Sequence, residues 1–152
     1  MPKDKKNLEQ RVISGSIELI EAIINNKTNA ITLDNGDIFY RAESHVLKII
    51  AEEPGIFSSK IARRFGVTRG AIQKILSRLE ERNLIIKEID ASDKKRIGLF
   101  LTEGGEQAFK LLVQYQMKIN AAFFSEISSM TEDELAAVNR FLLTARNVLK
   151  KM

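Results

Sequence analysis

The sequence has no cysteine, no tryptophan, two prolines and a single histidine, His45, in 152 residues. Without cysteine, the chain has no disulfide, no thiol redox switch and no thiolate ligand for a metal. A zinc or iron site would have to be built from carboxylates around one imidazole. We therefore expect no metal site and no cofactor.

Long apolar runs are also missing. No segment approaches the roughly 20 apolar residues of a membrane-spanning helix. The first ten residues, MPKDKKNLEQ, are charged and have no apolar centre. We expect a cytoplasmic protein. The sequence also has no GxSxG motif, no P-loop and no Gly-rich dinucleotide fingerprint after a strand, so we expect that it is not an enzyme.

The positive charge is concentrated in the middle of the chain. The net charge is only +4, but residues 41–102 hold 13 Lys/Arg and 8 Asp/Glu, a balance of +5, and the remainder holds 11 and 12, a balance of −1. Six basic residues and no acid lie between Ser58 and Arg78: Lys60, Arg63, Arg64, Arg69, Lys74 and Arg78. This distribution predicts contact with a polyanion, although a merely solvated basic surface would have the same composition.

The segment that carries this charge, SSKIARRFGVTRGAIQKILSRLEER at residues 58–82, has the pattern of two short helices joined by a tight turn. Gly66 marks the turn, because glycine takes a positive φ without strain. Ala62 is small enough to let the helices touch. Ser58 and Thr68 are the expected N-caps of helices over 59–65 and 69–82. The apolar faces of the pair comprise Ile61, Phe65, Val67, Ile72 and Ile75.

The second helix has an apolar stripe and an opposite polar face, as a helix that reads the major groove of DNA requires. Gln suits adenine, Lys and Arg suit guanine, and glycine lets the backbone come close to the duplex. The expected base contacts are Arg69, Gly70, Gln73 and Lys74. The expected phosphate or wing contacts are Ser58, Lys60, Thr68, Ser77, Arg78, Lys94, Lys95 and Arg96. The alternative is an ordinary exposed helix face.

Two strand-like runs, Leu84–Ile89 and Ile97–Thr102, flank the polar tip DASDKKR. They predict a hairpin, or wing, whose basic tip suits a minor groove or its phosphates. Asp93 would be repelled by DNA, so we expect it to accept hydrogen bonds within the turn and to hold a neighbouring cation.

The remaining segments predict further helices and one small hairpin. Helices are expected over 5–25, ending at Asn25–Asn29, and over 42–52; between them Asn35-Gly36 predicts a hairpin over 31–40, with an irregular loop as the alternative. Gly104-Gly105 is expected to break the chain before a long helix over about 106–127. The T-x-x-E sequence at Thr131 predicts a capping box that opens a last helix.

The first and last helices have broad apolar faces, which a core of about 60 residues cannot cover. On the first helix this face comprises Leu8, Val12, Ile13, Ile17, Leu19, Ile20, Ile23 and Ile24. The pattern predicts a homodimer built from residues 5–25 and 106–150, with a coiled-coil contact to another protein as the alternative.

The sequences SSKIARRFGVTRGAIQKILSRLEERNLI and DKKRIGLFLTEGG resemble the MarR (multiple antibiotic resistance regulator) family of winged-helix transcription regulators. The family's wing typically reads D-x-R-x-x-x-L-x-L-T, and Asp93, Leu99, Leu101 and Thr102 fit it. Lys95 stands where Arg is usual and Arg96 follows it, so insertion into a minor groove could shift to Arg96. The hairpin at 31–40 departs from the family's commoner helical connection.

The resemblance implies a mainly α fold with a small β wing. Residues 1–30 would form an N-terminal dimerisation helix, 31–105 a winged helix-turn-helix DNA-binding core, and 106–152 C-terminal dimerisation helices. It implies a homodimeric regulator of transcription, expected to be a repressor, that binds double-stranded DNA at a near-palindromic operator. The alternative is a winged-helix module that binds an acidic protein partner through its basic face.

Regulators of this kind often release DNA on binding a small anionic aromatic or lipophilic effector between the dimerising helices and the winged core. Position alone makes five residues candidates for such a pocket, although each could instead belong to the core: Phe39, Tyr40, His45, Tyr115 and Met117.

Overall fold

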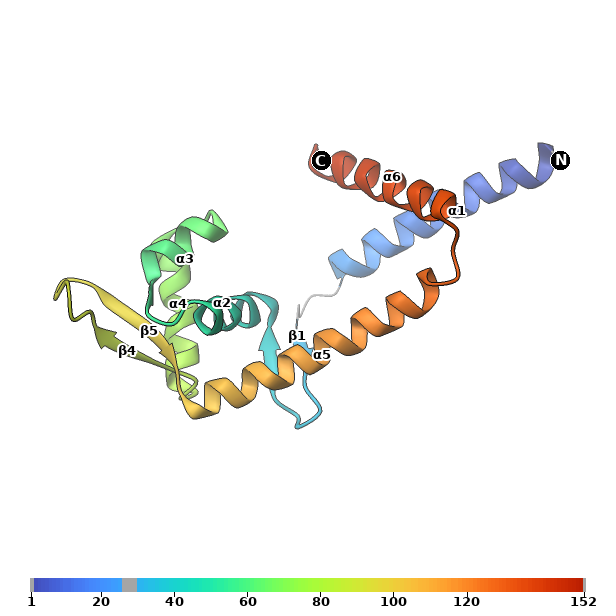
Figure 1. The fold of residues 1–152 in the computed structure, drawn as a ribbon. Helices are drawn as coiled ribbons and strands as arrows, with labels where there is room; N and C mark the ends of the chain where they lie inside the picture. The colour runs from blue at the N-terminus through green and yellow to red at the C-terminus, as the bar shows by residue number, and fades with distance from the viewer. Residues whose placement is uncertain (1, 26–29, 152) are drawn as a thin grey trace.

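The computed structural model describes residues 2–25 and 30–151 (Figure 1). The elements follow in the order α1 (Pro2–Asn25), β1 (Ala30–Thr32), β2 (Ile38–Tyr40), α2 (Arg41–Glu52), β3 (Ile56–Phe57), α3 (Ser58–Phe65), α4 (Arg69–Glu81), β4 (Ile85–Ile89), β5 (Ile97–Leu101), α5 (Glu103–Ile127) and α6 (Glu132–Leu149). The mainly α fold with a small β wing is therefore confirmed.

The central part of the chain is a winged helix-turn-helix. Helices α2, α3 and α4 pack together beside an antiparallel sheet in the order β3-β5-β4. The wing strands pair from Ile85 opposite Leu101 to Ile89 opposite Ile97. The largest fully buried side chains of this unit come from the three helices, β4 and β5, and include Leu47, Ile50, Ile61, Ile72, Leu76, Leu79, Ile85 and Leu99. The sequence did not predict β3, whose two residues pair with the middle of β5.

The turn between α3 and α4 has the predicted geometry. Gly66 has φ +64° and ends α3, and the Thr68 hydroxyl caps α4 by accepting the Ala71 N–H at 3.2 Å. Two expectations were wrong. Ser58 is the first helical residue and not the N-cap, because the extended Phe57 of β3 occupies that position. Val67 is 44% exposed, because it lies in the turn outside both apolar faces.

The segment before α2 forms the predicted hairpin. Strand β1 pairs with β2 from Ala30 opposite Tyr40 to Thr32 opposite Ile38, which excludes an irregular loop. The connection is held by the Asn35 side chain, whose Oδ1 accepts the Asp37 N–H at 3.0 Å. Gly36 has φ +89°, a conformation that L side chains rarely adopt.

Helix α5 begins three residues earlier than expected. Gly104 and Gly105 do not break the chain; they form the first turn of α5, and the Thr102 hydroxyl caps it by accepting the Gly105 N–H at 3.0 Å. A Cβ at Gly105 would lie 1.9 Å from the Leu84 carbonyl oxygen. The glycine therefore lets the start of α5 approach the backbone that leads into β4.

Helix α6 begins at the predicted capping box. Glu134 N–H donates to the Thr131 hydroxyl at 3.3 Å, and Thr131 N–H donates to the Glu134 carboxylate at 2.8 Å. The described helix α1 runs to Asn25; its expected end at 26–29, and the side chains of Ile23 and Ile24, lie outside the described residues.

Helices α1 and α6 lie apart from the winged core, and α5 leads away from that core (Figure 1). Helix α6 buries none of its residues, and none of the described side chains of α1 is buried. Large apolar side chains on these three helices are exposed, among them Leu8, Ile13, Leu19, Met117, Phe123, Phe124, Leu142 and Val148. Within residues 2–25 and 30–151, no helix combines the length and the apolar character that a bilayer crossing requires.

Candidate nucleic-acid interface

The exposed face of α4 carries the four predicted base contacts. Arg69, Gly70, Gln73 and Lys74 are all exposed, opposite a face buried from Ile72 to Leu79. Among the described residues, neither Arg69 nor Lys74 forms an ion pair within the chain. Their charges are therefore available to a ligand. A Cβ at Gly70 would meet only the Thr68 hydroxyl, at 3.9 Å, so packing within the chain does not require this glycine.

The predicted phosphate contacts on α3 and α4 differ in their surroundings. Thr68 and Ser77 are exposed, and Ser58 is half-buried. The Lys60 ammonium pairs with the Glu53 carboxylate, which also accepts a hydrogen bond from Arg64. The hydrogen bond from Lys60, and after it that from Arg64, lowers the pKa of the Glu53 carboxyl. Lys60 would have to leave this partner, or share it, in order to bind a phosphate.

Arg78 is near a carboxylate that sequence reasoning missed. Its Nη1 lies 3.9 Å from Glu43 Oε1, and the Nη1 of Arg82 lies 3.6 Å from Glu43 Oε2. Glu43 is buried, and its Oε2 accepts the Tyr40 N–H at 2.9 Å. The sequence signal was weak, because tyrosine is not among the usual N-cap residues that would identify Glu43 as the third residue of a capped helix.

The wing tip has the predicted acidic anchor. Asp93 Oδ1 accepts the Lys95 N–H at 3.0 Å, and its Oδ2 lies 3.4 Å from Arg96 Nε. Asp93 therefore shapes the turn and holds a cation, as expected. The Arg96 guanidinium also lies 5.1 Å from the centre of the Phe57 ring, towards the base of the wing. Lys94 and Lys95 are exposed and, in the part of the chain described, have no ion-pair partner.

The base of this turn is held by a second carboxylate. Asp90 accepts hydrogen bonds from the Ser92 hydroxyl at 2.5 Å, from the Ser92 N–H at 2.7 Å and from the Asp93 N–H at 3.0 Å. The hydroxyl bond, followed by the backbone bonds, lowers the pKa of the Asp90 carboxyl. The tip is therefore a folded turn that presents its lysines on a defined backbone.

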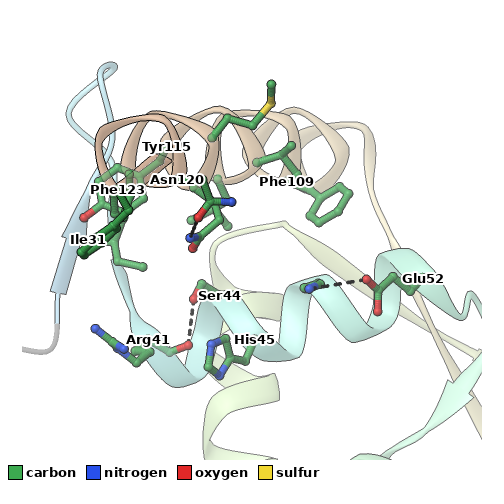
Figure 2. A pocket seen from close by; sticks show the side chains of 15 residues that line it. Ile31, Arg41, Ser44, His45, Glu52, Phe109, Tyr115, Asn120 and Phe123 are labelled. Carbon is green, nitrogen blue, oxygen red and sulfur yellow. Dashed lines mark hydrogen bonds and ion pairs between the residues drawn. The ribbon is translucent and has the colours of Figure 1, made fainter. Parts of the chain in front are cut away.

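A cavity of about 700 Å³ lies between α2 and α5, beside β1 (Figure 2). Figure 2 shows Arg41, Ser44 and His45 on α2 and Tyr115 and Phe123 on α5 around this space. Three of the five residues predicted for an effector pocket line it: His45, Tyr115 and Met117. The His45 ring also stacks on Phe65, with 6.2 Å between the ring centres.

The other two predicted pocket residues, Phe39 and Tyr40, do not line this cavity. Phe39 is fully buried in the core, and Tyr40 lies at a shallow groove beside the end of α4. They are separated because successive side chains of a strand point to opposite faces. Sequence reasoning also missed Arg41 and Lys48, two basic residues of the cavity wall. Among the described residues, no group of three or more potential metal ligands occurs.

The central segment of the chain is similar to known proteins. The sequence profile of the MarR family matches residues 39–97. A protein of Thauera aromatica, described as a transcriptional regulatory protein for the hcr operon, is 32% identical over 83 residues, which are 55% of this chain and 50% of that protein. The Escherichia coli transcriptional regulator HosA is 27% identical over 88 residues, which are 58% of this chain and 65% of HosA. The match thus spans between half and two thirds of each relative.

A solved structure extends the likeness to most of the fold. The structure of Lactococcus lactis ZitR, wild type in complex with DNA, has a TM-score of 0.74 and covers 92% of this chain and 97% of its own. At 20% sequence identity this likeness shows the shared fold. The two curated relatives are described as transcriptional regulators, in agreement with the expectation from the sequence. The winged-helix segment, the profile match and these relatives together show that residues 39–97 are similar to the MarR family of transcriptional regulators.

Proposed function

We propose that this protein is a sequence-specific regulator of transcription that binds double-stranded DNA as a homodimer. The observation that carries the proposal is the exposed face of α4, where Arg69, Gln73 and Lys74 stand together without an acidic neighbour on that face. This face belongs to a helix-turn-helix beside a basic wing, and a protein of the same fold, ZitR, has been solved with DNA. We also propose that it acts in the cytoplasm.

The proposed contacts divide by chemistry. Gln73 would read adenine, and Arg69 and Lys74 would read guanine, while Gly70 lets the helix approach the base edges. Phosphates would be bound from α3 and α4 by Ser58, Lys60, Thr68, Ser77 and Arg78, and from the wing by Lys94, Lys95 and Arg96. Lys94 and Lys95 are better placed than Arg96 to reach beyond the tip, because Arg96 is engaged by Asp93 and Phe57.

The dimer would be built by the helices that the single chain leaves uncovered. We divide the chain into an N-terminal dimerisation helix at 1–30, a DNA-binding core at 31–105 and C-terminal dimerisation helices at 106–152. The exposed apolar side chains of α1, the far end of α5 and α6 support this division. Two reading helices related by a two-fold axis would meet half-sites about one helical turn apart, so the operator would be near-palindromic. Binding there would repress transcription.

The cavity between α2 and α5 would receive an effector. Its wall combines the aromatic rings of Phe109, Tyr115 and Phe123 with the cations of Arg41 and Lys48, of which Lys48 is shared with Glu52 at 3.7 Å. This lining suits a small anionic aromatic or lipophilic molecule. Since α5 leads to the proposed dimer interface and α2 packs on α4, a ligand there could bias the spacing of the two reading helices.

The test is a comparison of Lys74→Ala with Lys110→Ala. Both variants lose one exposed lysine, but Lys110 lies on α5, away from the reading face. On a preferred duplex at fixed salt, Lys74→Ala should weaken binding by about 1–3 kcal/mol and relax specificity, and Lys110→Ala should not. Wild-type affinity should also fall roughly 10³–10⁵-fold between about 50 and 200 mM salt if about 6–10 phosphates are bound.

Equal affinities for the two variants would show that the reading face is assigned wrongly. Binding to an acidic polypeptide such as polyglutamate, with no preference among duplexes, would instead favour the protein-interaction module.

A further inference from the structure

Glu43 stands out as the one buried charged residue in the described part of the chain. Its side chain is 4% exposed and lies between the start of α2 and the end of α4. One carboxylate oxygen accepts the Tyr40 N–H at 2.9 Å and lies 3.6 Å from Arg82 Nη1; the other lies 3.9 Å from Arg78 Nη1. Arg78 belongs to the last turn of α4, the proposed recognition helix, and Arg82 directly follows this helix as its C-cap.

Helix capping alone does not require a charge at this position. A glutamine at the third position of α2 could accept the Tyr40 N–H equally well. A buried carboxylate is unfavourable unless cations compensate it. Glu43 is buried beside two arginines. This placement therefore indicates that its charge interacts with the end of α4 as well as with the start of its own helix, α2.

The two arginines are held in different ways. The Arg82 guanidinium lies 4.1 Å from the centre of the Phe39 ring, which is fully buried. Arg82 is thus fixed between the carboxylate and the ring. The Arg78 side chain is 57% exposed and remains able to reach a phosphate, although its Nη1 lies 3.9 Å from the Glu43 carboxylate. Glu43 therefore contacts both arginines at the end of α4, and it would compete with a phosphate for Arg78.

We propose that Glu43 is a positioning residue for DNA reading, which fixes the pose of α4 through Arg82 and restrains Arg78. The inference rests on the proposed DNA-binding function. A fixed pose favours the sequence that the helix matches, and a restrained Arg78 disfavours phosphate contacts with any duplex. The residue would thus raise the ratio of specific to non-specific affinity and not overall affinity.

The matched variants are Glu43→Gln and Glu81→Gln. Both remove one negative charge from the same groove, but Glu81 is exposed and, among the described residues, has no ion-pair partner. The affinity of each variant is measured, at one salt concentration, for a duplex selected by the wild type and for a scrambled duplex of equal composition; thermal melting monitors folding. Glu81→Gln should strengthen both affinities by a similar factor. Glu43→Gln should keep or strengthen scrambled binding and weaken selected binding, so the ratio falls about tenfold, as for one misplaced base contact.

A second variant tests the route through Arg82. Arg82→Gln should lower the ratio as Glu43→Gln does, and the double variant should show little further loss, because both changes disrupt one interaction. Additive losses would contradict a shared route and overturn the inference.

Two further results would overturn it. One is that Glu43→Gln and Glu81→Gln show the same ratio of selected to scrambled affinity. The other is a parallel loss of both affinities together with a lowered melting temperature, which would make Glu43 a structural residue only. If the wild type prefers no duplex, the proposed function itself is wrong. If the wild type has a clear preference and Glu43→Gln has the same preference, only this inference is wrong.

Discussion

Replacing Phe124 by serine should dissociate the proposed dimer without unfolding the winged core. Phe124 lies near the far end of α5 and is 68% exposed in the single chain. A phenylalanine side chain can bury about 200 Å². At about 25 cal/mol per Å², covering the exposed part is worth about 3 kcal/mol for each copy.

A two-fold interface contains the residue twice, so the upper estimate is about 6 kcal/mol for the dimer. Incomplete coverage and ordering of side chains reduce this, and we expect about 3 kcal/mol, or about 100-fold weaker dimerisation. Sedimentation equilibrium over a series of protein concentrations measures this constant directly.

The matched control is Ile89→Ser on the wing. Ile89 is 70% exposed, so the substitution removes an equally exposed apolar side chain outside the proposed interface. This control should leave the dissociation constant unchanged, and Leu142→Ser on α6 should weaken the dimer as Phe124→Ser does. A wild type that sediments as a monomer at micromolar concentration would refute the reasoning. So would equal effects of Phe124→Ser and Ile89→Ser.

Three further predictions concern the fold and the wing. Gly105→Ala should lower the melting temperature strongly, because its Cβ would lie 1.9 Å from a backbone oxygen. Gly70→Ala should leave the melting temperature unchanged or raise it, and should instead weaken DNA binding. The hydrogen bond from Lys60 lowers the pKa of the Glu53 carboxyl in the folded protein below its ordinary value of 4.5. The ionised carboxylate therefore stabilises the fold fully at a pH above its pKa in the unfolded chain, and this stabilisation is lost as the pH falls through its pKa in the folded protein. Glu53→Gln should therefore remove part of the acid-induced loss of stability, measured by melting from about pH 6 to about pH 2. Lys95→Ala should weaken selected and scrambled duplexes alike in a binding titration, because a phosphate contact does not read sequence; a loss confined to the selected duplex would contradict this.

Features set by neighbouring residues were predictable from the sequence. Thr68, Gly66 and the T-x-x-E box at Thr131 act within one helical turn, and the structure confirms all three. The exposed face of α4 follows from the helical period, so its four candidate residues could be placed together without knowing the fold.

Features set by distant parts of the chain were not predictable. Strand β3 exists because two of its residues pair with β5. The glycines at the start of α5 predicted a break in the chain, because the sequence does not reveal the close approach of Gly105 to Leu84. The contact of Glu43 with Arg82 joins residues 39 positions apart, and the cavity depends on how α2 packs against α5. Helical and strand periodicity describe each element alone, so they do not give these contacts.

The central claim is sequence-specific DNA binding by a dimer, and selection from a randomised pool of duplexes tests it most directly. The purified protein would be used at about 150 mM salt, where non-specific phosphate contacts are weakened. We predict enrichment of an inverted repeat whose half-sites lie about one helical turn, about 10 base pairs, apart. A folded protein that enriches no sequence from the pool would contradict the claim.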